Sequence, residues 1–168
     1  LVHKSDLGMV RLGLRDTAAV ADAASEMAAR ARATLPKVRI DGFAVQETVQ
    51  GEAEVIIGIR NDAQFGPILV LGLGGVAVEI LRDVAVAPAP LARSRVQRMI
   101  AELRTAPLFF GARGRPPLDT DSIADAVERV SWLAADLGPR LVDLEINPLI
   151  VGREGTHAVA VDVRGVFR

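Results

Sequence analysis

The amino-acid sequence predicts a mixed α/β (α+β) fold in which antiparallel strand pairs are flanked by helices. Apolar runs typical of strands occur in pairs joined by short glycine-containing links, as at Gly51 and at 152–155. Two long segments with apolar residues at helical spacing, 17–35 and 123–137, separate these pairs. The order does not alternate strictly between strand and helix, which argues against a doubly wound nucleotide-binding sheet.

Length and composition favour one globular domain over residues 1–168. Half of the residues are hydrophobic, 24% are charged and the formal net charge is −1. The chain can therefore bury a sizeable core, and it lacks the basic excess of a nucleic-acid-binding protein. It contains no cysteine, which excludes disulfides and thiol chemistry. The longest apolar run, 67–80, is interrupted by glycines and a glutamate, so we expect no membrane span and a cytoplasmic location.

The N-terminal part is expected to contain a strand followed by a helix. A strand over 8–14 is predicted because every second residue from Val10 is apolar. Asp16 or Thr17 is positioned to cap the alanine-rich helix 17–35, which a proline ends.

The middle of the chain is expected to form two strand pairs. Alternation of apolar and polar residues predicts strands at 43–49 and 54–59, connected at Gly51. The nearly continuous apolar segment 67–73 is typical of a strand buried on both faces, and we expect a second strand at 76–81.

The next elements are expected to be an extended connector at 84–90, an amphipathic helix at 91–103 and a glycine- and proline-rich loop at 107–120. A helix is expected at 123–137, capped by Asp121 or Ser122. Strands are expected at 141–146, 149–151 and 157–163. The Asn147-Pro148 dipeptide is expected to turn the chain at the rim of the sheet.

The acidic segment before that dipeptide is a candidate metal site. Glu145 and Asn147 are two positions apart in a strand, so their side chains project to the same face. A carboxylate and an amide oxygen are ligands suited to Mg²⁺. Asp162 follows the last apolar strand and is positioned to return to the same rim. A polar strand end followed by a turn is the alternative interpretation.

Three further groups of polar residues could bind a ligand or take part in a reaction. Glu47 and Glu54 flank a strand connection that offers backbone groups and carboxylates to a base and a ribose, whereas the residues alone favour a solvated hairpin tip. His3 is one of two histidines and can act as a phosphoryl acceptor, or belong to a frayed terminus. Arg113 and Arg115 lie in a glycine-rich stretch, where they either contact a phosphate or form a plain turn.

Taken together, these segments resemble one family over essentially the whole chain. The segments are HKSDLGMVRLGL, VQETVQGEAEVIIGIRNDAQFGPILVLGLGGVAVEILRDVA, LFFGARGRPPLD and DLEINPLIV followed by AVD. In this order they are similar to the ATP-grasp part of ADP-forming acyl-CoA synthetases, relatives of the succinyl-CoA synthetase β subunit. The resemblance implies the second lobe of an ATP-grasp domain. We expect the first lobe, its nucleotide-binding lysine and the CoA-binding domain to lie outside these residues.

The resemblance also implies roles for individual residues. These are adenine binding at Glu47 and Val49, ribose binding at Glu54, Mg²⁺ binding at Glu145, Asn147 and Asp162, and phosphoryl relay at His3. The implied reaction converts an acid, CoA and ATP to acyl-CoA, ADP and phosphate, with ATP and Mg²⁺ bound by this chain.

The implied partners are a CoA-binding domain or α subunit, a small carboxylic acid and CoA. A non-catalytic ATP-grasp module that senses nucleotide or assembles subunits is the alternative function. We also expect a homo-oligomer, and no nucleic-acid or membrane partner.

Overall fold

The computed structural model describes residues 7–34, 39–75, 82–112 and 114–168. The chain divides into two compact units, unit 1 (Leu1–Thr48) and unit 2 (Val49–Arg168). The single domain expected over 1–168 stays a prediction. No helix within the described ranges is both long and apolar enough to cross a membrane.

Unit 1 contains the helix α1 (Thr17–Thr34), which confirms the predicted helix to within a residue. The Asp16 carboxylate accepts a hydrogen bond from the backbone N–H of Ala19 at 2.8 Å, so Asp16 is the capping residue. An ion pair of 2.6 Å between Arg11 and Glu26 joins the preceding segment to the helix.

The strands predicted at 8–14 and 43–49 are not formed. Both segments are irregular, and Val10 and Leu12 are 43% and 79% exposed. A strand needs a neighbour to satisfy its backbone N–H and C=O groups, and neither segment has one among the described residues. The expected connection at Gly51 therefore does not join two strands.

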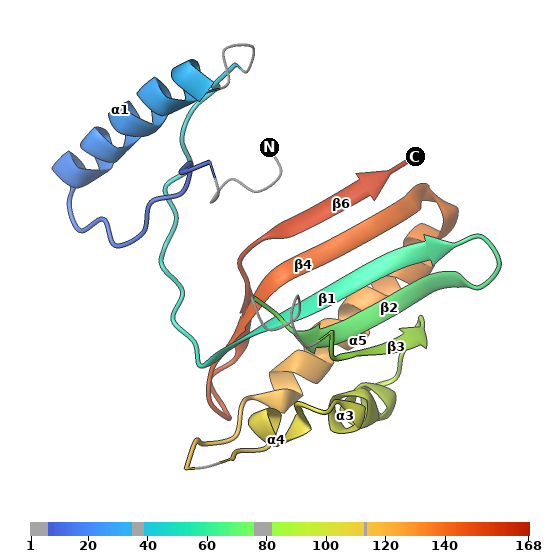
Figure 1. The fold of residues 1–168 in the computed structure, drawn as a ribbon. Helices are drawn as coiled ribbons and strands as arrows, with labels where there is room; N and C mark the ends of the chain where they lie inside the picture. Colours follow the sequence, from blue (N-terminus) through green and yellow to red (C-terminus); the bar gives the residue numbers. More distant parts are fainter. Residues whose placement is uncertain (1–6, 35–38, 76–81, 113) are drawn as a thin grey trace. The chain divides into compact units, whose positions relative to one another are not determined.

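Unit 2 is built on a six-stranded sheet with antiparallel pairing throughout (Figure 1). Its strands are β1 (Ala53–Asp62), β2 (Gly66–Leu73), β3 (Val84–Pro88), β4 (Leu141–Val151), β5 (Ala158–Ala160) and β6 (Val163–Phe167). The order is β3-β2-β1-β4-β5, and β6 also pairs with β4. The predicted mixed fold with antiparallel strand pairs and flanking helices is confirmed.

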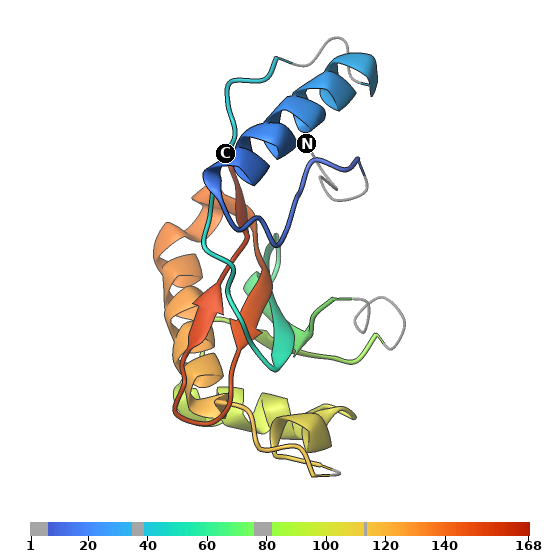
Figure 2. The same ribbon diagram turned by 90° about the vertical axis from the view of Figure 1, so that its left-hand side faces the viewer.

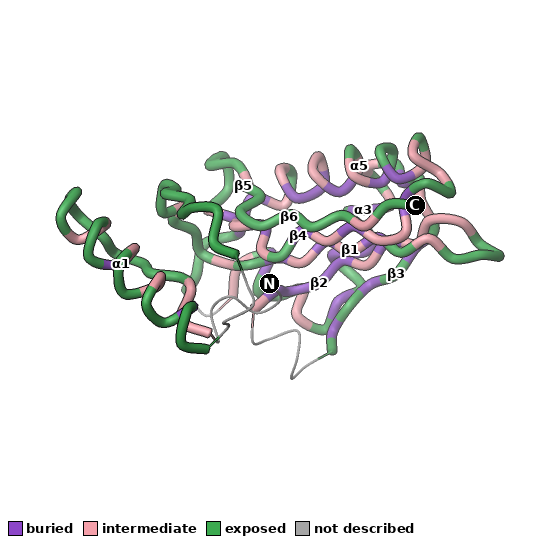
Figure 3. Tube along the Cα trace, turned by 90° about the horizontal axis from the view of Figure 1, so that it is seen from above, coloured by how far each residue is buried: buried purple, intermediate pink, exposed green. Residues whose placement is uncertain are grey.

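The helices of unit 2 are α3 (Arg93–Glu102), the short α4 (Ala106–Phe109) and α5 (Thr120–Leu137), which continues into the 3₁₀ turn η1 (Gly138–Arg140). In Figures 2 and 3, α5 lies along one side of the strands. The core fills the space between that side and the helices. Its largest fully buried side chains are Phe109, Ile57, Leu69, Leu71, Met99, Ile100, Ile123 and Leu141.

Asp119 caps α5, where the sequence favours Asp121 or Ser122. Its carboxylate accepts the backbone N–H of Ser122 at 2.9 Å and that of His157 at 3.0 Å. Burial raises the pKa of Asp119, but these backbone hydrogen bonds outweigh burial and hold the pKa below its ordinary value. The second bond fastens the turn between β4 and β5 to the start of α5, a long-range contact that sequence spacing does not reveal.

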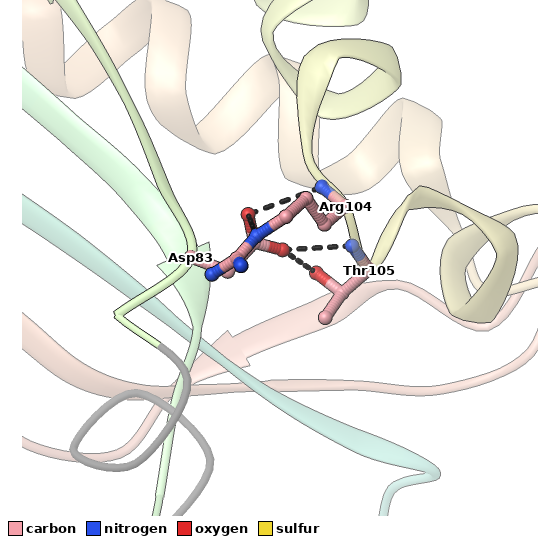
Figure 4. A network of polar contacts seen from close by, with 3 residues as sticks. All are labelled: Asp83, Arg104 and Thr105. Atoms are coloured by element: carbon pink, nitrogen blue, oxygen red, sulfur yellow. Dashed lines mark hydrogen bonds and ion pairs between the residues drawn. The ribbon is translucent and has the colours of Figure 1, made fainter.

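Asp83 fastens the start of β3 to the junction between α3 and α4 (Figure 4). Its carboxylate accepts the backbone N–H groups of Arg104 and Thr105 at 3.1 and 2.7 Å and the Thr105 hydroxyl at 2.6 Å. Burial raises the pKa of Asp83, yet the hydrogen bonds from Thr105 and Arg104 and the Arg104 charge lower it overall.

Two segments expected to be irregular contain regular structure. Residues 84–88 form β3, which pairs with β2 in the register Val70↔Val86. Proline is tolerated here because Pro88 is the last residue of a strand at the edge of the described sheet. Within the predicted loop 107–120, α4 occupies the first residues, with Pro107 in its first turn, where no N–H is needed.

β4 runs through the point where a turn was expected. Its 11 residues join the two strands predicted at 141–146 and 149–151, and the Asn147-Pro148 peptide is cis. The pairing with β1 shifts register there, because β4 has two residues opposite Ile56. On the side of β4 that faces away from β1, strand β5 ends and strand β6 begins beside Asn147-Pro148. The strand expected at 157–163 is thus limited to β5, and β6 was not predicted. The strand expected at 76–81 lies outside the described residues.

Candidate functional site

The sheet face opposite the helices in unit 2 carries polar side chains beside apolar ones such as Val70 and Ile150. Along β1, Val55, Ile57 and Ile59 are buried, and the residues between them project to the other face. We call this second face the polar face and define it by Glu54, Gly58, Arg60, Glu145 and Arg164.

The register across three strands sets one row of this face. Gly58 of β1 pairs with Glu145 of β4, which pairs with Arg164 of β6. Among the described residues, a Cβ on Gly58 would meet only the Cβ of Val70, at 3.8 Å. The glycine therefore leaves open space beside Glu145 that a larger residue would fill.

Glu145 and Asn147 project together, as the spacing predicts. The Asn147 amide nitrogen donates to Oε1 of Glu145 at 3.1 Å. Because the amide nitrogen is engaged in this way, the amide oxygen of Asn147 is directed elsewhere and can act as a ligand.

Asp162 lies beside Asn147 in the structure. The backbone N–H of Asn147 donates to the carbonyl of Asp162 at 3.0 Å, and Val161 donates to the carbonyl of Pro148 at 3.1 Å. These two bonds hold the link between β5 and β6 against the bulge of β4. The backbone of Asp162 is therefore adjacent to that of Asn147, whose side chain contacts Glu145.

The donor set suits Mg²⁺ that arrives with a phosphate. In the described parts of the chain, no three His, Cys, Asp or Glu side chains are grouped to hold a metal ion. Two carboxylates and one amide oxygen remain. Mg²⁺ is commonly held by one or two carboxylates together with water and substrate phosphates, so the residues present fit that kind of site.

A groove of about 520 Å³ opens at the start of β1 and is lined by residues that include Val49, Glu54, Gly75, Arg115, Leu118 and Ile150. The backbone N–H of Gly74 donates to the Glu54 carbonyl at 2.7 Å. A Cβ on Gly75, whose φ is +63°, would lie 2.7 Å from Oε2 of Glu54. The positive φ favours glycine here, and the absence of a side chain leaves room for the Glu54 carboxylate.

The remaining candidates are placed differently. Val49 and Glu54 both line the groove, whereas Glu47 belongs to unit 1, where it is exposed in an irregular segment. His3 and Arg113 lie outside the described residues.

Gly58 and Arg164 are residues of the polar face that the sequence analysis did not single out. Arg164 lies two positions after Asp162, so strand periodicity offered a signal for it. Gly58 is indicated only by its pairing with Glu145.

Comparison with known proteins agrees with this geometry. Residues 1–166 match the family described as the ATP-grasp domain. The chain is 40% identical over 99% of its length to acetate–CoA ligase (ADP-forming) I of Archaeoglobus fulgidus, of which it spans 24%. It is 35% identical over its whole length to the β subunit of acetate–CoA ligase (ADP-forming) II of Pyrococcus furiosus, of which it spans 71%.

A solved structure is similar over the entire chain. This is the dinucleotide-forming acetyl-coenzyme A synthetase 1 of Ca. Korarchaeum cryptofilum in complex with coenzyme A, Ca-AMPCP and HgCl⁺, with 36% identity. The TM-score is 0.92, covering 100% of this chain and 72% of that one. The chain belongs to the ATP-grasp domain family of ADP-forming acyl-CoA synthetases.

Proposed function

We propose that this chain is the ATP- and Mg²⁺-binding part of an ADP-forming acyl-CoA synthetase, which converts an acid, CoA and ATP to acyl-CoA, ADP and phosphate. The observation that supports this most strongly is the adjacency of Asn147 and Asp162, with Glu145 beside them, on the polar face. Such a set of oxygen ligands suits the metal that accompanies a nucleoside triphosphate.

The nucleotide extends along β1 in this proposal. Glu54 binds the ribose, and Glu47 and Val49 bind the adenine. Gly58, beside Glu145, lies four residues further along β1 than Glu54, a span of about 13 Å at about 3.3 Å per residue. A ribose 5′-triphosphate can bridge this span, so its outer phosphates reach the acidic residues when the sugar is held at Glu54.

Asn147 and Asp162, with Glu145, hold Mg²⁺ in the proposed complex. Bound there, the ion supplies positive charge that offsets the charge developing on the transferred phosphoryl group. Gly58 keeps this part of the face open to the phosphates.

His3 is proposed to accept the phosphoryl group from ATP and to carry it toward the acid. The N–P bond to the imidazole forms as the bond to ADP breaks, and the carboxylate then takes the phosphoryl group and releases the histidine. Attack by CoA on the acyl phosphate forms the thioester and releases phosphate. The acid and CoA are bound by a CoA-binding domain or α subunit. Cytoplasmic location and homo-oligomerisation also stay predictions.

The experiment that tests this function measures thioester formation by the full-length protein supplied with ATP, Mg²⁺, CoA and short carboxylic acids. We expect acyl-CoA and ADP in equal amounts. We also expect an acid-labile phosphate from γ-labelled ATP that is absent in His3→Asn. Release of AMP and pyrophosphate, or no thioester with any acid, would contradict the proposal.

A further inference from the structure

We infer that Arg164 is a phosphate-binding residue, whose guanidinium binds the outer phosphate oxygens of the nucleotide on the polar face. This inference rests on the proposed function and deepens it. It adds a cation to a site for which only acidic and amide residues have been named.

The strand register brings Arg164 to this position. Arg164 pairs with Glu145, and Glu145 pairs with Gly58 on its other side. Directly paired residues of neighbouring antiparallel strands project to the same face, with Cβ atoms about 4.5–5.5 Å apart. Arg164 therefore lies on the same face as the open space above Gly58, one strand beyond Glu145 and two residues after Asp162.

The guanidinium of Arg164 is available to a ligand. Within the ranges that the structure describes, its side chain makes no hydrogen bond or ion pair, although a carboxylate lies directly across from it. Glu145 instead accepts the amide of Asn147. Arg153, which is also exposed, pairs with Glu52 at 2.8 Å.

The chemistry of the neighbouring residues indicates a phosphate as the ligand. An arginine binds phosphate through two parallel N–H···O bonds. The outer phosphates bear much of the nucleotide's negative charge, and the carboxylates of Glu145 and Asp162 would repel them without a cation. Mg²⁺ on one side and Arg164 on the other would offset that charge together.

The test compares three ligands binding to the full-length protein, measured by calorimetry in Mg²⁺: β,γ-methylene-ATP, AMP and adenosine. In Arg164→Gln we expect at least tenfold weaker binding of β,γ-methylene-ATP and less than twofold change for AMP and adenosine. Arg164→Lys, which keeps the charge but not the paired donors, should recover part of the loss. Unchanged thermal unfolding of both variants would show that β6 remains folded.

Arg60 supplies the matched control, since it lies on the same face one row away, opposite Asp143. Arg60→Gln should change the affinity for β,γ-methylene-ATP less than twofold. An equal loss in Arg60→Gln would overturn the specific contact in favour of a general charge effect, and unchanged affinity in Arg164→Gln would overturn it outright. If the wild-type protein binds none of the three ligands, the proposed function itself fails. If the wild-type protein binds them and the Arg164 variants bind them equally well, only the assignment of Arg164 fails.

Discussion

The backbone N–H of Asn147 donates to the carbonyl of Asp162 at 3.0 Å, although the two residues lie 15 positions apart in the chain. They come together because β4 bulges at Asn147-Pro148, at the point where the neighbouring strand is interrupted between β5 and β6. The interruption leaves Asp162 out of regular pairing and beside the bulge. Two irregularities in adjacent strands thus bring together the two residues that we propose as oxygen ligands of Mg²⁺.

Loss of either member of this pair should impair turnover more than folding. In the full-length enzyme, Asn147→Ala or Asp162→Ala is expected to lower kcat about a hundredfold or more, because the charge stabilisation from a bound metal amounts to several kcal/mol. The measurement is steady-state turnover at Mg²⁺ concentrations near half-saturation of the parent enzyme. Glu154→Ala is the control, because Glu154 is an exposed carboxylate in the nearby turn whose backbone N–H bond to Pro117 is retained. Near-normal turnover in both ligand variants would refute the metal assignment.

Filling the space at Gly58 should block the nucleotide and leave the fold intact. A Cβ there makes only an ordinary contact with Val70, and β-branched residues are favoured in strands. We expect Gly58→Val to melt within a few degrees of the parent protein but to bind an ATP analogue at least tenfold more weakly. Gly58→Ala should show a smaller loss.

Calorimetric titration with adenosine provides the control for Gly58. Adenosine lacks the phosphates, so its affinity should change less than twofold in Gly58→Val. Undiminished binding of the ATP analogue by a folded Gly58→Val protein would mean that the phosphates lie elsewhere.

The stability of the protein should fall in acid because of Asp83 and Asp119. Both pKa values are held below the ordinary 3.8 in the folded state, by hydrogen bonds that outweigh burial. A lowered folded-state pKa contributes stability that is complete above the unfolded-state value and is lost as the pH falls through the folded-state value. The urea-derived free energy of unfolding attributable to these groups should therefore be constant above about pH 5 and decline below it.

Asparagine variants isolate that contribution. Asp83→Asn and Asp119→Asn should each lower the free energy of unfolding by about 1–3 kcal/mol at pH 7, since each weakens several part-buried hydrogen bonds from backbone N–H groups. The difference from the parent protein should shrink as the pH falls below 3.8. Asp22→Asn, an exposed position on α1, should stay within about 0.5 kcal/mol. A difference for Asp83→Asn that does not change with pH would contradict this explanation.

Exposed apolar residues of unit 1 should drive self-association. Leu12 is 79% and Val45 is 74% exposed, within two segments whose alternation is typical of strands. Patches of this kind promote association. We expect sedimentation velocity to show oligomers in the micromolar range and Leu12→Asp with Val45→Asp to weaken association at least tenfold. A strictly monomeric profile for the parent chain would contradict the expectation.

Helices were more predictable than strands in this chain. Helical periodicity and a nearby proline define α1 closely, because both signals are local. The alternation of apolar and polar residues at 8–14 and 43–49 is equally clear. A strand also needs a neighbouring strand to pair with, however, and the sequence does not identify one. Conversely, β3 was not predicted because its segment contains two prolines. An edge strand tolerates proline, and β3 lies at an edge of the described sheet.

The part of the candidate site that is formed by residues close together in one strand was predictable from the sequence. Two-residue periodicity is sufficient to bring Glu145 and Asn147 together. The position of Arg164 depends on which residue of β6 pairs with Glu145, and a one-residue slip would send it to the helix side. The cap at Asp119 depends on His157, 38 residues away. Long-range register and turn contacts of this kind are set by the packed sheet.

The most direct test of the account is the Mg²⁺ dependence of nucleotide binding. The affinity of the full-length protein for β,γ-methylene-ATP is measured with and without Mg²⁺, in the parent protein and in Asp162→Ala. Because the metal is proposed to be shared between Asp162 and the phosphates, Mg²⁺ should strengthen binding at least tenfold in the parent protein and less than twofold in Asp162→Ala, with adenosine binding equal in both. An equally large Mg²⁺ effect in Asp162→Ala, or no nucleotide binding by the parent protein, would contradict it.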